Sequence, residues 1–124
     1  MKYIIMMFGD QNTMMETRSP EWIREMMGFM MKLDQEIRDA GEYVDGQGLV
    51  DPSEAKTVRL ENGIPVATDG PYAEAKESLA GWWIIDADEA RAIDIASRCV
   101  AFTGRPFEVR QVEVRQVADA PPEV

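Results

Sequence analysis

Residues 79–89 read LAGWWIIDADE, a short apolar run that passes directly into a mostly acidic cluster. A continuous apolar run of this length predicts a strand that is buried on both faces. Asp86 followed three residues later by Glu89 matches the pattern in which an acidic N-cap opens a helix. The stretch therefore predicts a buried strand over residues 79–85 and a helix from about residue 87 to residue 102.

The second helix is expected to pack one apolar face on the sheet, because its small and apolar residues recur at helical spacing. This face is predicted to consist of Ala92, Ile93, Ala96, Cys99 and Val100. Cys99 is most simply a small core residue on that face.

A first helix is predicted between Ser19, a good N-cap, and Gly41, which suits the position just past a C-terminus. Pro20 fits the first helical position, where its missing N–H costs nothing. Apolar residues on this helix cover an arc about twice as wide as packing on one sheet requires, so we expect a second subunit to cover the surplus. The main stripe is Trp22, Met26, Phe29, Met30, Leu33, Ile37 and Ala40, and the surplus is Ile23, Met27 and Met31.

The remaining strands are predicted from apolar runs and from alternation of apolar and polar residues. They cover residues 3–8, 42–50, 56–60, 64–68 and 107–117. The second of these is expected to be interrupted at residues 45–48 by a loop with a bulge, and the last to carry a bulge between Val109 and Val112. Asn62-Gly63 between two alternating segments predicts a β-hairpin.

Without the hairpin, the order is strand, helix, strand, strand, helix, strand. This βαββαβ order predicts a ferredoxin-like α+β fold with an inserted β-hairpin. A chain of 124 residues favours one domain. We expect it to span residues 1–117, with residues 118–124 as a loose C-terminal tail.

The composition of the chain excludes several classes of binding partner. The chain holds 23 acidic and 13 basic residues, a formal net charge of -10, so we expect neither nucleic acid nor an anionic membrane surface as a partner. No apolar run approaches the ~20 residues that span a bilayer. Cys99 is the single cysteine, which excludes an internal disulfide and favours the cytoplasm.

The chain contains no histidine. That absence excludes Ser-His-Asp and Cys-His catalysis, so any chemistry would depend on Asp, Glu, Lys, Arg, Tyr or backbone groups. No Asp-rich calcium loop is present, and the sequence predicts neither a metal site nor a cofactor.

Residues 69–77, DGPYAEAKE, closely resemble the Asp-Gly-Pro-Phe signature of one branch (DGPF-type) of the YCII-related proteins. Supporting matches are the opening Met1-Lys2-Tyr3, Gly46-Gln47-Gly48-Leu49, Gly81-Trp82-Trp83 and Glu108-Val109-Arg110. The resemblance implies a ferredoxin-like fold that pairs as a dimeric α+β barrel, with a ligand or active-site cleft near the signature. It also implies a regulatory link to sigma factors. Other members carry a His-Asp pair regarded as catalytic, which this chain lacks.

The candidate catalytic residues are Asp69, Tyr72 and Asp10, and the candidate ligand-binding residues are Gly70, Pro71, Glu74, Lys76, Gly46, Gly48, Arg59 and Trp82. Turn chemistry alone also explains Asp69-Gly70-Pro71, and Asp10 equally suits a turn cap. Trp82 and Trp83 are neighbours on one strand, so one should meet the helices and the other the barrel interior.

Two main hypotheses follow. The first is a homodimeric small-ligand-binding or regulatory domain. The second is a small cofactor-free enzyme (isomerase, lyase or oxygenase-like), in which Asp69 or Asp10 is the acid–base group and Tyr72 or Arg59 stabilises an anion. A pure interaction module for a transcription factor is a third possibility, and it would bind a sigma factor.

Overall fold

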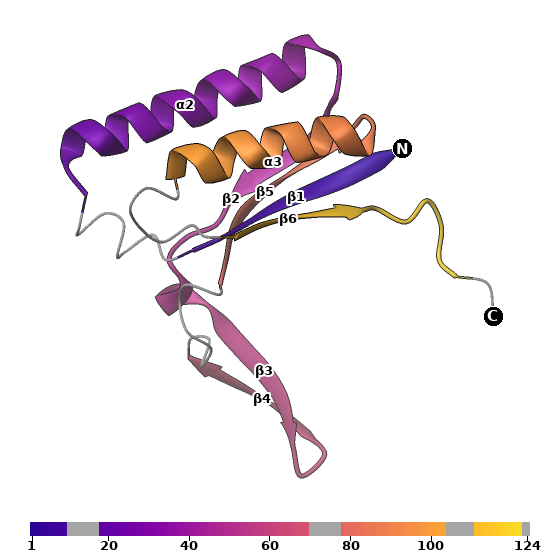
Figure 1. Cartoon of the computed structure of the whole chain (residues 1–124). Helices are drawn as coiled ribbons and strands as arrows, with labels where there is room; N and C mark the ends of the chain where they lie inside the picture. Colours follow the sequence, from indigo (N-terminus) through magenta and orange to yellow (C-terminus); the bar gives the residue numbers. More distant parts are fainter. Residues whose placement is uncertain (10–17, 70–77, 104–110, 123–124) are drawn as a thin grey trace.

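The computed structural model describes residues 1–9, 18–69, 78–103 and 111–122. Two helices lie on one face of a four-stranded sheet, and a hairpin projects from one end of that sheet on the side opposite the helices (Figure 1). The elements are β1 (Lys2–Phe8), α2 (Pro20–Asp39), β2 (Tyr43–Gly48), a 3₁₀ turn (Pro52–Glu54), β3 (Lys56–Glu61), β4 (Ile64–Asp69), β5 (Leu79–Asp86), α3 (Glu89–Thr103) and β6 (Gln111–Gln116).

The four-stranded sheet has the order β2-β5-β1-β6, and every neighbouring pair is antiparallel. β3 and β4 pair only with each other in a separate two-stranded sheet. Leaving the hairpin out, this is the strand order of the ferredoxin-like fold, so the predicted α+β class is confirmed.

The core lies between this sheet and the two helices. Alternate residues of β1 and β5 point toward the helices, and the helices contribute residues at helical spacing. The core residues are Tyr3, Ile5, Leu33, Ile37, Trp83, Ile85, Ala92, Ile95, Ala96 and Cys99. The predicted core position of Cys99 is thereby confirmed. Stacked rings of Phe29 and Phe102, with centroids 4.7 Å apart, join α2 to α3.

α2 begins and ends where local signals place it. The Ser19 hydroxyl accepts a hydrogen bond from the backbone N–H of Trp22 at 3.1 Å, as an N-cap does. Gly41 follows the helix with a φ of +72°, which a side chain would strain. The predicted surplus of apolar surface is confirmed in part, because Met27 and Met31 are 54% and 71% exposed.

The predicted start of α3 was wrong by two residues. Asp88, not Asp86, is the cap, and its carboxylate accepts from the Arg91 N–H at 2.8 Å. Asp86 instead ends β5, where its partner across the ladder is Lys2. The extra strand pairing holds residue 86 extended, and the helix can begin only after it.

The predicted apolar face of α3 was also partly wrong. Ile93 and Val100 are exposed, and Ile95 is buried in their place beside Ala92, Ala96 and Cys99. These four buried residues follow the i, i+3, i+4, i+7 spacing of a single narrow face. The helix presents this face to the sheet, so Ile93 and Val100 point away from it.

β2 differs from the prediction because residues 45–48 continue the strand instead of forming a loop. They pair with β5, and the register shift lies between Tyr43 and Asp45, ahead of the position predicted for the bulge. A Cβ on Gly46 would approach Trp83 Cδ1 to 2.7 Å, so the glycine admits the indole ring.

The hairpin is confirmed, with positive φ at both Asn62 and Gly63, as a tight hairpin turn requires. The bulge predicted between Val109 and Val112 involves residues that lie outside the described part of the chain.

Candidate functional site

The two faces of the four-stranded sheet have different surroundings. The face opposite the helices, here called the open face, carries a central apolar patch from β1 and β5. All six side chains are partly buried, and none of them belongs to the core or packs against it. They are Ile4, Met6, Phe8, Ala80, Trp82 and Ile84. Within the described ranges, no helix covers this face (Figure 1).

Trp82 forms a side-chain hydrogen bond at the open face. Its indole N–H donates to a carboxylate oxygen of Asp45 on the neighbouring strand β2, at 3.1 Å, and both residues are partly buried. This bond fixes the orientation of the ring on the open face. Gln47 lies directly opposite Trp82 across the ladder. The arrangement can hold a flat apolar group beside a carboxylate.

Charged residues border the patch on its other side. In β6, Glu113 is paired with Met6 and Arg115 with Ile4, and both are exposed. Directly paired residues share a face of the sheet. The open face is therefore apolar in the middle and polar at both edge strands, which is a common composition for a binding surface.

Trp83 points to the opposite side, as strand alternation predicts. Its indole N–H donates to Asp34 of α2 at 3.0 Å, and Arg38 binds the other oxygen of the same carboxylate at 2.7 Å. Burial tends to raise the pKa of Asp34, but the hydrogen bonds from Arg38 and Trp83 outweigh it and hold this pKa below its usual value. Arg38 also lies over the Tyr43 ring at 3.7 Å. This group locks α2 onto the sheet.

Several predicted site residues lie outside the described ranges: Asp10, Gly70, Pro71, Tyr72, Glu74 and Lys76. The described residues next to these segments lie at one end of the sheet. The Gly9 N–H donates to the Ser78 carbonyl at 3.0 Å, and Phe8 pairs with Gln111. The end of β1 and the starts of β5 and β6 therefore meet at one end of the sheet.

Asp69 and Arg59 lie in the hairpin, apart from Trp82 in the four-stranded sheet. Asp69 is exposed at the end of β4 and forms an ion pair with Lys56. The ladder pairs Asp69 with Lys56 and Arg59 with Val66, so alternation places Asp69 and Arg59 on opposite faces of the hairpin. The enzymatic hypothesis therefore depends on residues outside the described part.

The two predicted glycines differ in role. Gly46 makes room for Trp83, whereas a Cβ at Gly48 would meet nothing within 4 Å. Asp45 was missed as a site residue because residues 45–48 were interpreted as a loop. Strand alternation through this segment would have placed Asp45 and Gln47 on one face.

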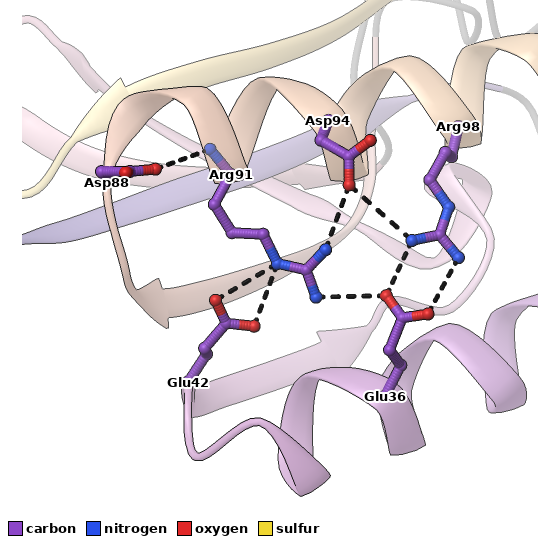
Figure 2. Close-up of polar contacts among 6 residues, drawn as sticks. All are labelled: Glu36, Glu42, Asp88, Arg91, Asp94 and Arg98. Atoms are coloured by element: carbon purple, nitrogen blue, oxygen red, sulfur yellow. Dashed lines mark hydrogen bonds and ion pairs between the residues drawn. The ribbon is translucent and has the colours of Figure 1, made fainter.

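An ionic network on the helix side of the sheet ties together α2, the start of β2 and α3 (Figure 2). The Arg91 guanidinium donates to Glu42 at 3.0 Å, to Asp94 at 3.0 Å and to Glu36 at 3.1 Å. Arg98 binds Glu36 with two hydrogen bonds, of 2.7 and 3.2 Å. Each nitrogen of Arg91 thus has a carboxylate partner, so the network joins elements of the fold and is not a vacant binding site.

Glu36 is the centre of this network. Hydrogen bonds from Arg98, and then from Arg91, lower the pKa of Glu36 to about 2. Its carboxylate therefore stays charged over the whole physiological range, and the two helices remain linked.

Known sequences resemble this chain over nearly its whole length. A family model described as YCII-related domain matches residues 1–118. A protein of Rhizobium meliloti (strain 1021), described as uncharacterized, is 29% identical over 125 residues, which cover 98% of this chain and 99% of that protein.

Proposed function

Because the chain belongs to the YCII-related domain family, we propose that it is a homodimeric small-ligand-binding domain of the DGPF-type branch. In the dimer, the open faces of two sheets face each other and enclose the ligand. The observation that carries this proposal is the open face itself, with its apolar patch and its oriented Trp82.

The open face supports pairing because an antiparallel sheet with one solvated face usually carries polar side chains on that face. Here β1 and β5 carry apolar side chains on both faces, and the helices cover only one of them. A second copy would place an equivalent apolar patch against the first, as the resemblance to dimeric α+β barrels implies.

The chemistry of the open face favours one class of ligand. Trp82 offers a flat apolar surface, and Asp45 offers a carboxylate that already accepts one hydrogen bond. An anionic ligand would bring like charges together at Asp45 in a partly desolvated place. A neutral or cationic molecule with a flat apolar part fits better.

The test is a titration of the ¹⁵N-labelled protein with N-phenyl-1-naphthylamine, a neutral flat probe, followed through its tryptophan indole N–H signals. We expect the Trp82 signal, identified by its loss in Trp82→Phe, to shift while the Trp22 signal stays in place. The anionic analogue 8-anilinonaphthalene-1-sulfonate should bind at least ~10-fold more weakly because of Asp45. A shift confined to Trp22, or tighter binding of the anionic probe, would contradict the proposal.

The link to sigma factors rests on the resemblance and stays a prediction. Co-purification of a sigma factor with the tagged chain from its own host is the measurement that checks it. Recovery of the chain without any sigma factor would count against a regulatory complex, and would leave the ligand-binding proposal standing.

A further inference from the structure

The β3–β4 hairpin presents an apolar face to solvent. Strand register pairs Val58 with Ala67 and Leu60 with Pro65, which puts these four side chains on one face, here called the arm face. All four are exposed, and Val58 and Leu60 reach 66% and 73%.

The two faces of this hairpin are buried to different extents, and the apolar one is the less buried. On the other face, Thr57, Val66 and Thr68 are partly buried, and the Thr68 hydroxyl donates to the Thr57 carbonyl at 3.3 Å. The more apolar face is thus the more exposed one. A two-stranded hairpin is marginally stable in water unless one face packs on another body. The arm face therefore needs a cover that no other described element supplies.

The limited size of the open face is a second reason to expect a contact at the arm face. The six apolar side chains of the open face are all partly buried, whereas a specific interface takes at least about 600 Å² from each partner. The four exposed side chains of the arm face would enlarge the apolar surface available for that contact. The hairpin also projects on the same side of the sheet as the open face (Figure 1).

The net charge of the hairpin indicates what kind of protein surface packs on the arm face. Residues 56–69 contain two basic residues, Lys56 and Arg59, and two acidic ones, Glu61 and Asp69, so the hairpin is neutral. The chain as a whole carries a net charge of -10. A neutral apolar arm lets two strongly acidic copies meet without adding to their repulsion, whereas a basic partner would be matched better by an acidic arm.

We propose that the β3–β4 hairpin is a dimerisation arm whose arm face packs on a second copy of this chain. The proposal rests on the homodimer of the proposed function. The arm extends the contact between the two open faces, and the positive φ values at its turn hold it in shape before the copies meet.

The test compares Val58→Thr/Leu60→Thr with the control Ile64→Thr by sedimentation equilibrium. Threonine keeps the strand propensity at these positions and removes apolar surface. Ile64 is 64% exposed but pairs with Glu61 on the other face of the hairpin. We expect the double variant to weaken dimerisation at least tenfold and the control to change it less than twofold. Added salt should strengthen the wild-type dimer, because it screens the repulsion between acidic copies.

The outcomes separate the two proposals. A wild-type chain that is monomeric at all concentrations overturns both. A wild-type dimer that the double variant leaves unchanged, or that the double variant and the control weaken equally, overturns the arm and leaves the proposed function standing.

Should the double variant fold poorly, a spin label gives a second measurement. Ile64→Cys, on the hairpin face that the arm contact does not use, is labelled with a nitroxide. Cys99 stays unlabelled because it is fully buried, and burial raises the pKa of its thiol to about 11. The labelled chain is mixed with ¹⁵N-labelled wild type. Broadening of the Trp82 indole signal on the unlabelled copy supports the arm, and its absence at dimer-forming concentration overturns it.

Discussion

Trp82 and Trp83 are neighbours on β5, and each donates its indole N–H to an aspartate, at 3.1 and 3.0 Å. Their surroundings nevertheless differ. Trp83 is 6% exposed in the core, and its partner Asp34 belongs to the helix that covers it. Trp82 is only partly buried, and its partner Asp45 belongs to the same sheet. The Trp83–Asp34 bond thus holds α2 on the sheet, whereas the Trp82–Asp45 bond only orients the Trp82 ring within the sheet. The open face still needs a covering body.

Removing each ring in turn should have different effects on stability. Trp83→Ala should lower the free energy of unfolding by about 3–5 kcal/mol, because it empties a packed core site and removes the indole donor from one oxygen of Asp34, which keeps only Arg38. Trp82→Ala should cost about 1–2 kcal/mol in the monomer, because that side chain has less packing to lose. Urea denaturation at protein concentrations below dimerisation measures both values. Equal losses would show that the two faces are covered equally.

A smaller change tests how β2 accommodates Trp83. Gly46→Ala should destabilise the fold by about 1–3 kcal/mol, because its Cβ would clash with the indole and push it away from Asp34. Gly48→Ala is the matched control on the same strand, where a Cβ meets open space, and it should stay within about 0.5 kcal/mol. If both variants melt alike, Gly46 does not serve close packing.

The sequence was sufficient to predict the elements whose structure depends on adjacent residues. Ser19-Pro20 and Gly41 predicted both ends of α2, and Asn62-Gly63 predicted the hairpin, because caps and tight turns depend on a few adjacent residues. It was insufficient where distant partners decide. The ladder between β1 and β5 kept Asp86 in the strand and moved the start of α3.

The candidate site shows the same limit. Alternation correctly predicted opposite directions for Trp82 and Trp83. The bond from Trp82 to Asp45 joins residues 37 positions apart in the chain, and no local pattern marks it. The partners of Arg91 on α2 and just before β2, Glu36 and Glu42, are likewise distant in sequence.

The ionic network makes the helix-covered face sensitive to pH. The pKa of Glu36 is lowered from 4.5 to about 2. Above pH 4.5 the carboxylate is charged in both the folded and unfolded chain, and its contribution to stability is complete. As pH falls, the unfolded chain takes up the proton first, so the contribution shrinks and is lost near pH 2.

Substitution checks this expectation. Because Glu36 is nearly half exposed, solvent screens its ion pairs, and Glu36→Gln should cost only about 1 kcal/mol at pH 7. The difference from wild type should vanish near pH 2. Glu25→Gln, at an exposed position of the same helix, is the control and should change little. A Glu36→Gln deficit that persists unchanged at low pH would contradict the role assigned to this carboxylate.

In the proposed dimer, a second copy covers the open face of the sheet. Sedimentation equilibrium of wild type, Met6→Lys and Met27→Glu/Met31→Glu tests this arrangement. Met6 lies in the apolar patch opposite Glu113, which can pair with the new lysine within the sheet. Met27 and Met31 are the exposed methionines of α2. The sequence alone placed the second subunit on the apolar surplus of α2, whereas the proposed dimer places it on the open face. We therefore predict a dimer for wild type and for the α2 variant, and a monomer for Met6→Lys. A dimeric Met6→Lys together with a monomeric α2 variant would place the interface on α2 and contradict this arrangement.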